Sequence, residues 1–207
     1  LKIGFNPNFA PFSYLKDGKP SGIVIERIVG IFEKSGIKYE LVPAELTGLT
    51  SGLMQGEFDI LAALAKTPER EKTLSFSNPI IVSGAAWFKA SNSVPLMDGE
   101  LPKMAVTPKV GPLVGQIKAL FPEIELLTSE NYDTSLQDVL DGKADAAALN
   151  WHVGKMLVRE KYNLLFHVPL APFNTMALHM ATKLPDKNNL IIRLNEHIPD
   201  DWGPDPL

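Results

Sequence analysis

The sequence contains no cysteine, and this absence excludes disulfide bonds and thiolate metal sites without favouring any cellular compartment. No apolar run approaches the roughly 20 residues that a membrane-spanning helix needs. The chain also lacks a basic excess, since 20 Lys and Arg residues stand against 24 Asp and Glu residues, for a formal net charge of -4. We therefore expect no nucleic-acid partner.

Several motifs of enzymes and nucleotide-binding proteins are absent as well. The sequence has no Gly-x-Ser-x-Gly, no Gly-x-Gly-x-x-Gly and no P-loop. Its four histidines lack Asp or Glu partners at metal-ligand spacing, so each is expected on the surface or in a core: His152, His167, His179 and His197. We predict that the protein is not an enzyme and has no catalytic residue, no cofactor and no metal site.

The chain does have enough apolar residues to build a core. It contains 207 residues, of which 45% are hydrophobic and 21% charged, and this size allows one large domain or two small lobes. It opens directly on an alternating apolar run at residues 1–5, and no signal peptide is visible. This start suggests that a leader or an upstream segment has been removed.

Strand and helix patterns alternate through the first third of the chain. Apolar runs and helical spacing predict strands at 1–5, 38–43 and 58–64, and helices at 22–35 and 46–54. A small hairpin is predicted between the first strand and the first helix, with its turn at Asp17-Gly18. This alternation is typical of a doubly wound parallel sheet.

The same alternation continues after a polar stretch at residues 91–102. We predict strands at 103–106, 125–127, 145–149, 164–168 and 176–182, and helices at 113–121, 132–140, 151–160 and 188–198. Ser129 or Asn131 is the expected cap of the helix at 132–140.

A weak internal echo links the two halves. Residues 54–64 and 140–149 both read as a helix end, a Gly turn, one Asp and a short apolar strand. The echo indicates either two similar lobes or merely the common appearance of strand–helix–strand units.

One arginine occupies a position that suits ligand binding. The strand at 58–64 is apolar enough to be buried on both faces, and Arg70 follows its carboxyl end. Ligands of open α/β sheets bind outside the carboxyl ends of the strands, and a guanidinium fork suits an anion. The alternative is a surface arginine paired with Glu69 or Glu71.

A set of short motifs runs through nearly the whole chain. The motifs are Pro11-Phe12-Ser13-Tyr14, residues 18–26, Gly56-Glu57-Phe58-Asp59, Thr67-Pro68-Glu69-Arg70-Glu71, Phe76-Ser77-Asn78-Pro79, Leu120-Phe121-Pro122 and residues 141–146. In this order and spacing, the chain resembles the periplasmic solute-binding proteins of the polar amino-acid uptake family, bacterial extracellular solute-binding family 3.

The resemblance implies an α/β protein with the two-lobed type II periplasmic binding protein clamshell. Each lobe would be a mixed, mainly parallel sheet flanked by helices, and the ligand would lie in the interlobe cleft. Lobe one would comprise residues 1–86 and 174–207, and lobe two residues 87–173. The chain would cross between the lobes near residues 85–89 and 171–175.

The resemblance also assigns ligand-binding roles in lobe one. Arg70 matches the arginine that grips the ligand's α-carboxylate. Phe9 matches the aromatic residue that stacks over the ligand; the alternative is that Phe9 belongs to the core of lobe one. Three further positions depart from the family pattern. Leu46 replaces a second aromatic residue, Ala65 replaces a Ser or Thr that bonds the carboxylate, and Asn6 replaces an acid found in some members.

Lobe two departs from the pattern at its main ligand contact. Asn150 stands where amino-acid binders usually carry the aspartate that holds the ligand's ammonium, and an amide cannot neutralise a buried charge. In the altered loop at 107–112, Lys109 either compensates as a point charge or is solvated. Trp151 either supplies an apolar wall or packs within its helix. We hypothesise a small organic anion held by Arg70, and not a standard zwitterionic amino acid.

The resemblance implies a monomeric periplasmic protein that binds a small organic solute, a carboxylate or a modified amino acid, for delivery to the membrane permease of an ABC-type uptake system. The alternative is the ligand-sensing domain of a histidine kinase or a cyclic-dinucleotide enzyme, whose partners would be its own membrane-bound signalling domains. Some cyclohexadienyl dehydratases share the fold, but the sequence offers no assignable pair of acid and base.

Overall fold

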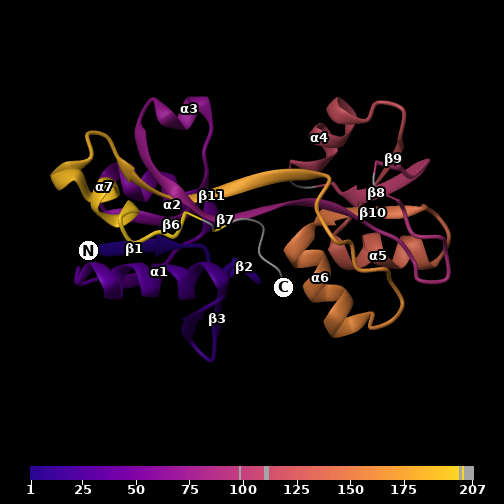
Figure 1. The fold of residues 1–207 in the computed structure, drawn as a ribbon, viewed down its shortest axis with the longest axis horizontal. Helices are drawn as coiled ribbons and strands as arrows, with labels where there is room; N and C mark the ends of the chain where they lie inside the picture. The colour runs from indigo at the N-terminus through magenta and orange to yellow at the C-terminus, as the bar shows by residue number, and fades with distance from the viewer. Residues whose placement is uncertain (98, 110–111, 201, 203–207) are drawn as a thin grey trace. The chain divides into compact units, whose positions relative to one another are not determined.

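The computed structural model describes residues 1–97, 99–109, 112–200 and 202 (Figure 1). The chain divides into two compact units, which are Leu1–Val82 with Met176–Leu207 (unit 1) and Ser83–Thr175 (unit 2). Two strands, β7 (Leu74–Phe88) and β11 (Asn174–Lys183), each contain residues of both units.

Unit 1 contains a mixed, mainly parallel sheet with the strand order β5-β1-β6-β11. Strand β1 (Lys2–Phe5) pairs in parallel with β5 (Glu40–Pro43) and β6 (Ile60–Ala65), and β11 pairs antiparallel to β6. Helices α1 (Ile23–Ser35) and α2 (Leu46–Gln55) connect these strands (Figure 1). The predicted strand–helix alternation is therefore confirmed.

Helix α1 shows why this part of the sequence folds as predicted. Its buried side chains recur at helical spacing and face the core: Val24, Ile25, Ile28, Ile31 and Phe32. The helix ends at Gly36, whose φ of 68° is the left-handed conformation that glycine adopts without strain. Upstream lies a small sheet of β2 (Asn8–Phe9), β3 (Ser13–Lys16) and β4 (Lys19–Ser21), with the predicted turn at Asp17-Gly18.

Unit 2 has the strand order β7-β10-β8-β9. Strand β8 (Met104–Pro108) is parallel to β9 (Glu125–Ser129) and β10 (Ala146–Asn150), and β7 is antiparallel to β10. The helices are α4 (Leu113–Leu120), α5 (Tyr132–Leu140) and α6 (Trp151–Lys161).

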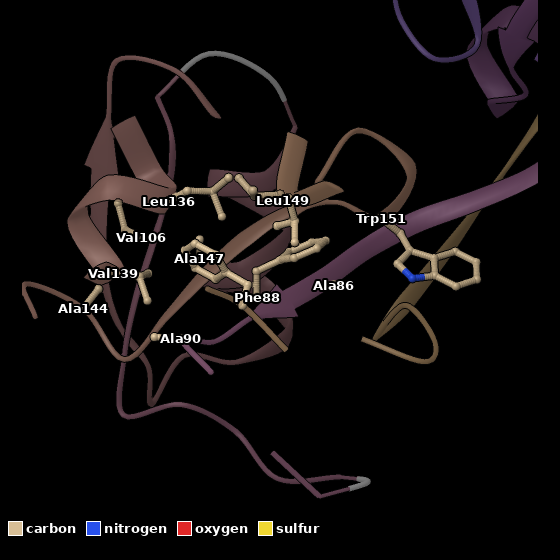
Figure 2. Close-up of a cluster of buried hydrophobic side chains, with 12 residues drawn as sticks. Ala86, Phe88, Ala90, Val106, Leu136, Val139, Ala144, Ala147, Leu149 and Trp151 are labelled. Carbon is tan, nitrogen blue, oxygen red and sulfur yellow. The ribbon is translucent and has the colours of Figure 1, made fainter. Parts of the chain in front are cut away.

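The core of unit 2 gathers side chains from β7, the three parallel strands and helices α5 and α6. Figure 2 shows part of this cluster, which includes Ala86, Phe88, Val106, Leu136, Val139, Ala147, Leu149 and Trp151. Phe88 is fully buried, and α6 approaches it so closely that a Cβ on Gly154 would lie 2.3 Å from its ring. Burial of these apolar groups is the main stabilising contribution to the unit.

The predicted strand at 164–168 is wrong. Leu164 has a φ of 66° and leaves 82% of its surface exposed, so the apolar run turns instead of extending. Only Phe166 forms a bridge, with Ala90, and it is buried. The short apolar run reflects one core residue flanked by exposed leucines, which a count of apolar residues does not distinguish from a strand.

The last predicted helix, 188–198, begins later and ends earlier than expected. The structure has a 3-10 turn at Lys187–Asn189 and then helix α7 (Leu190–Asn195). Asn188 and Asn189 have φ values of 60° and 51°, so the backbone is left-handed where the prediction placed helix. The Asp186 carboxylate accepts hydrogen bonds from the backbone N–H groups of Leu190 and Ile191 and fixes the later start.

Candidate functional site

Arg70 is held at the carboxyl end of β6 by the local fold. It lies on the short helix α3 (Pro68–Glu71), where Thr67 Oγ1 accepts a hydrogen bond from the Arg70 backbone N–H at 3.3 Å. The half-buried side chain returns to the strand, and Nη1 donates to the carbonyl of Ala65 at 2.7 Å. One of the five guanidinium N–H donors is thereby committed, and the planar group is oriented.

The acidic neighbours of Arg70 pair with lysines. Glu71 Oε1 lies 2.8 Å from Lys66 Nζ, and Glu69 Oε2 lies 2.5 Å from Lys72 Nζ. Among the residues that the structure describes, Arg70 makes no ion pair. The alternative of a surface arginine paired with Glu69 or Glu71 is therefore not what the fold contains, and the guanidinium remains available to an anion.

The other candidates of unit 1 lie on neighbouring loops and helices. The half-buried Phe9 ring lies 4.6 Å from that of Phe12, centroid to centroid. Asn6 orders the loop that carries Phe9, since its Oδ1 accepts from the backbone of Asn8 at 2.9 Å. Leu46 begins α2, and its side chain lies outside the described residues. Ala65 contributes the carbonyl that orients Arg70.

Asn150 ends β10 and caps helix α6. Its side-chain Oδ1 accepts hydrogen bonds from the backbone N–H groups of His152 at 3.0 Å and Val153 at 3.1 Å. Its Nδ2 donates to Ser83 Oγ at 3.2 Å. The half-buried amide is thus fixed on both sides at the carboxyl end of a parallel strand.

Three residues around Asn150 were not singled out as site residues from the sequence. Ser83 Oγ lies 2.6 Å from His152 Nδ1, and both side chains are fully buried. Burial raises the pKa of the Tyr132 phenol, and a hydrogen bond with the backbone of Asn150 opposes this shift. The one usable sequence signal was an Asn directly before a predicted helix, which is typical of an N-cap.

Trp151 and Lys109 have protein partners in unit 2. Trp151 is 4% exposed, donates from Nε1 to the Pro169 carbonyl at 3.0 Å and belongs to the core cluster (Figure 2). Lys109 is exposed and lies 2.6 Å from Glu130. Residues 110 and 111 of the loop at 107–112 lie outside the described residues. Trp151 is therefore a core residue of its unit, and Lys109 forms an ion pair at the surface.

Two classes of feature are not found in the part of the chain that the structure describes. No group of three or more His, Cys, Asp or Glu side chains is arranged to hold a metal ion. No helix among the same residues is long and apolar enough to cross a membrane.

A comparison of the sequence with known families identifies its relatives. The model of the bacterial extracellular solute-binding proteins, family 3, matches residues 1–190. The chain belongs to this family. The family's description names its members as extracellular solute-binding proteins, and the named relatives of the chain are mainly binding proteins.

The relatives include both binding proteins and sensor proteins. A probable histidine-binding protein of Campylobacter jejuni is 25% identical over 167 residues, which cover 80% of this chain and 65% of that protein. The virulence sensor protein BvgS of Bordetella bronchiseptica is 26% identical over 153 residues, which cover 70% of this chain and 12% of the sensor. The chain thus spans less than two thirds of the length of either relative.

Solved structures show the same fold. The L-cystine solute receptor of Neisseria gonorrhoeae, in its unliganded open conformation, superposes with a TM-score of 0.80 at 22% identity, over 95% of this chain and 84% of that chain. An ancestral amino-acid-binding protein, a precursor of cyclohexadienyl dehydratase, gives a TM-score of 0.67 at 23% identity, over 96% and 87% of the two chains. At these identities the likeness establishes the type II periplasmic binding fold alone.

Proposed function

We propose that the chain binds a small organic carboxylate, gripped by Arg70, for delivery to an ABC-type uptake permease. The observation that carries the proposal is the oriented Arg70 guanidinium, which is fixed to the Ala65 carbonyl and makes no ion pair among the described residues. A planar fork with donors to spare suits a carboxylate, which accepts two parallel hydrogen bonds.

Each unit, taken by itself, offers different chemistry to a solute. Unit 1 offers the charge of Arg70 together with the aromatic ring of Phe9. Unit 2 offers Asn150, which carries no charge. An ammonium group left beside a neutral amide in a closed site would lack its counter-charge, and burial of an unpaired charge is costly. We therefore favour a carboxylate or a modified amino acid over a zwitterionic α-amino acid.

Solute binding would shift the populations of different arrangements of the two units. A ligand changes such an equilibrium only through contacts that are better in one arrangement than in another. A permease that recognises the liganded arrangement would then receive the solute from a monomeric extracytoplasmic protein.

A sensor role is the second candidate, and a specific observation favours it. The sequence similarity to BvgS extends over 70% of this chain, and that relative is a sensor protein. The same solute chemistry would then control membrane-bound signalling domains of the same polypeptide. The coding sequence after Leu207 decides between the roles: a stop codon favours transport, whereas a membrane helix followed by kinase or cyclase domains favours sensing.

The binding proposal is tested by native mass spectrometry of the protein as purified. We expect a small carboxylic acid to co-purify with the unaltered chain and to be lost from the Arg70→Ala variant. Isothermal calorimetry with the identified acid then gives the affinity of both proteins. Retention of the same molecule by the variant, or co-purification of a cation or an uncharged sugar, would contradict the proposal.

A further inference from the structure

A pocket of about 250 Å³ lies in unit 1, between α1 and the segment that follows α7. From α1 it is lined by Glu26, Arg27, Gly30, Ile31 and Lys34. His197 and Trp202 line it from the later segment. All of these residues belong to unit 1, and none of them is part of the carboxylate site proposed at Arg70. The pocket is therefore a separate feature that unit 1 forms by itself.

Gly30 accounts for the open space on the α1 side of the pocket. It lies well inside the helix, where glycine is less favourable than alanine. A Cβ added to Gly30 would meet no atom within 4 Å beyond the helix backbone around it, so no close packing contact requires glycine there. Gly154 of α6 is the contrast, because its Cβ would lie 2.3 Å from the Phe88 ring. The missing side chain of Gly30 instead leaves a notch in the surface of α1.

Trp202 gives the pocket an aromatic wall. The Arg27 guanidinium carbon lies 4.5 Å from the centroid of the indole, which is a cation–π contact. Arg27 is fixed in turn, since its Nη1 donates to the Ile80 carbonyl at 2.5 Å. Ile31, which is 1% exposed, adds aliphatic surface to the lining. An oriented indole and an aliphatic side chain together suit the ring of an aromatic ligand.

The charged groups of the pocket favour an anion. Arg27 and Lys34 carry two positive charges against the one negative charge of Glu26, which gives a net charge of +1 when His197 is neutral. Side chains on a helix lean toward its N-terminus. Lys34 therefore extends over the turn that contains Gly30, whereas Glu26 leans away from it.

Two donors of the lining remain available to a ligand. Among residues 1–97, 99–109, 112–200 and 202, no hydrogen bond or ion pair engages the Lys34 ammonium or the His197 imidazole. An ammonium supplies three N–H donors, and a neutral imidazole supplies one. A carboxylate accepts such bonds, and its bond with an ammonium is charge-assisted and therefore stronger than a neutral one.

We propose that this pocket is a second ligand site, which binds a small aromatic carboxylic acid. The ring of the acid lies against Trp202, in the notch that Gly30 leaves. Its carboxylate accepts hydrogen bonds from Lys34 and His197. The acid must be small, because a volume of about 250 Å³ is below the roughly 300–1,000 Å³ of pockets for drug-sized ligands. The inference goes beyond the proposed function and does not depend on it.

The substitution Gly30→Leu tests the pocket because it fills the notch with a side chain that favours a helix. Gly48→Leu is the matched control. Gly48 lies in α2 of the same unit, its Cβ would also meet no such atom within 4 Å, and it does not line the pocket. Lys34→Gln removes the ammonium, whereas Lys34→Arg keeps a cation with N–H donors. Each substitution is combined with Arg70→Ala, so that an acid held at Arg70 is not mistaken for one in the pocket.

Binding is measured by isothermal calorimetry with aromatic acids and their matching amines, namely benzoate and benzylamine, phenylacetate and phenethylamine, and indole-3-acetate and tryptamine. Acetate, which has no ring, is a further control. We expect at least one acid to bind the Arg70→Ala protein about tenfold or more tightly than its amine and acetate do. Gly30→Leu and Lys34→Gln should each weaken binding of that acid by about tenfold or more, and the two control substitutions should leave it within about threefold.

Several outcomes would overturn the inference. They are failure of every acid to bind the Arg70→Ala protein, a preference for the amines, and unchanged affinity in Gly30→Leu or Lys34→Gln. Equal losses in Gly30→Leu and Gly48→Leu would also overturn it, because the loss would then not arise from the notch. Acids that bind only when Arg70 is intact would support the proposed function and contradict the second site. Circular dichroism and thermal melting establish that the compared proteins are folded.

Discussion

Asp59 and Asp145 hold the first parallel strand of their own units with the same pair of hydrogen bonds. In unit 1, the Lys2 N–H donates to the Asp59 carboxylate at 2.7 Å, and the Asp59 N–H donates to the Lys2 carbonyl at 2.9 Å. In unit 2, Met104 and Asp145 exchange the equivalent bonds, both at 2.9 Å. The sequence echo between the two segments therefore corresponds to a shared structure.

The approach to each aspartate is shared as well. Gly56 follows α2 with a φ of 85°, and Gly142 lies just after α5 with a φ of 74°. Both glycines allow a left-handed turn that leads the chain back into the third strand of its unit. Two similar units, rather than a chance likeness of strand–helix–strand segments, are the interpretation that these matched contacts favour.

The aspartate contact makes a first prediction about stability. Asp145→Ala should lower the free energy of unfolding by about 1–2 kcal/mol, because the Met104 N–H loses a charged acceptor. Asp145→Asn should lose less, since an amide oxygen can still accept this bond. Urea unfolding of the two variants beside the unaltered chain measures the difference. Equal losses in both variants would show that the charge is essential to the contact.

A second prediction concerns Gly84 in β7. A Cβ at this position would lie 1.8 Å from the Asn174 carbonyl oxygen and 2.8 Å from the Pro172 Cβ. Gly84→Ala should therefore destabilise the protein by about 3 kcal/mol, because backbone atoms must shift. Gly30→Ala is the matched control, since α1 leaves open space there and alanine favours a helix by up to about 1 kcal/mol. Thermal melting should give shifts of opposite sign.

A third prediction concerns solute affinity. Arg70→Ala should weaken binding of the co-purified acid by about 30-fold or more, which corresponds to loss of about 2 kcal/mol or more from a buried anion. Lys72→Ala removes the same charge from an exposed side chain near α3 that pairs with Glu69, and it should leave the affinity within about twofold. Calorimetry on both variants makes the comparison. Similar losses in the two would indicate a general effect of charge.

A fourth prediction follows from His179. Burial is the largest effect on its imidazole and lowers the pKa below the usual 6.5. The Ser77 carbonyl and Glu71 raise this pKa, Lys66 lowers it, and the net shift is downward. The unfolded chain therefore binds the proton first as pH falls. Stability is fully present above pH 6.5 and declines as pH falls from there toward the lower pKa of the folded state.

The measurement is urea unfolding of the unaltered chain and of His179→Asn at intervals from pH 5 to pH 8. The Ser77 carbonyl only accepts, so His179 Nδ1 carries the hydrogen, and an asparagine amide can supply the same donor. The difference in stability between the two proteins should change below pH 6.5 and be constant above it. A constant difference over the whole range would contradict the assignment.

Most elements were predictable because their signals are local. The spacing of Ile25, Ile28 and Phe32 marks the buried face of α1, and Gly36 marks its end, without reference to any other part of the chain. The failures occurred where a local pattern has two outcomes. The apolar run at 164–168 contains one buried residue, Phe166, which forms an isolated bridge with Ala90. Its apolar neighbours Leu164, Leu165 and Val168 are exposed and belong to no strand.

The sequence by itself determined the alternation of strands and helices, the family and the candidate arginine, since periodicity, turn residues and motif spacing are written in short segments. Only the tertiary structure decided what each polar side chain faces. Asn150 meets Ser83 across 67 residues of sequence, and Trp151 meets Pro169 across 18. Hydrogen-bond partners are set by contacts between segments that folding brings together, and these contacts decide which groups the Asn150 amide and the Trp151 indole meet.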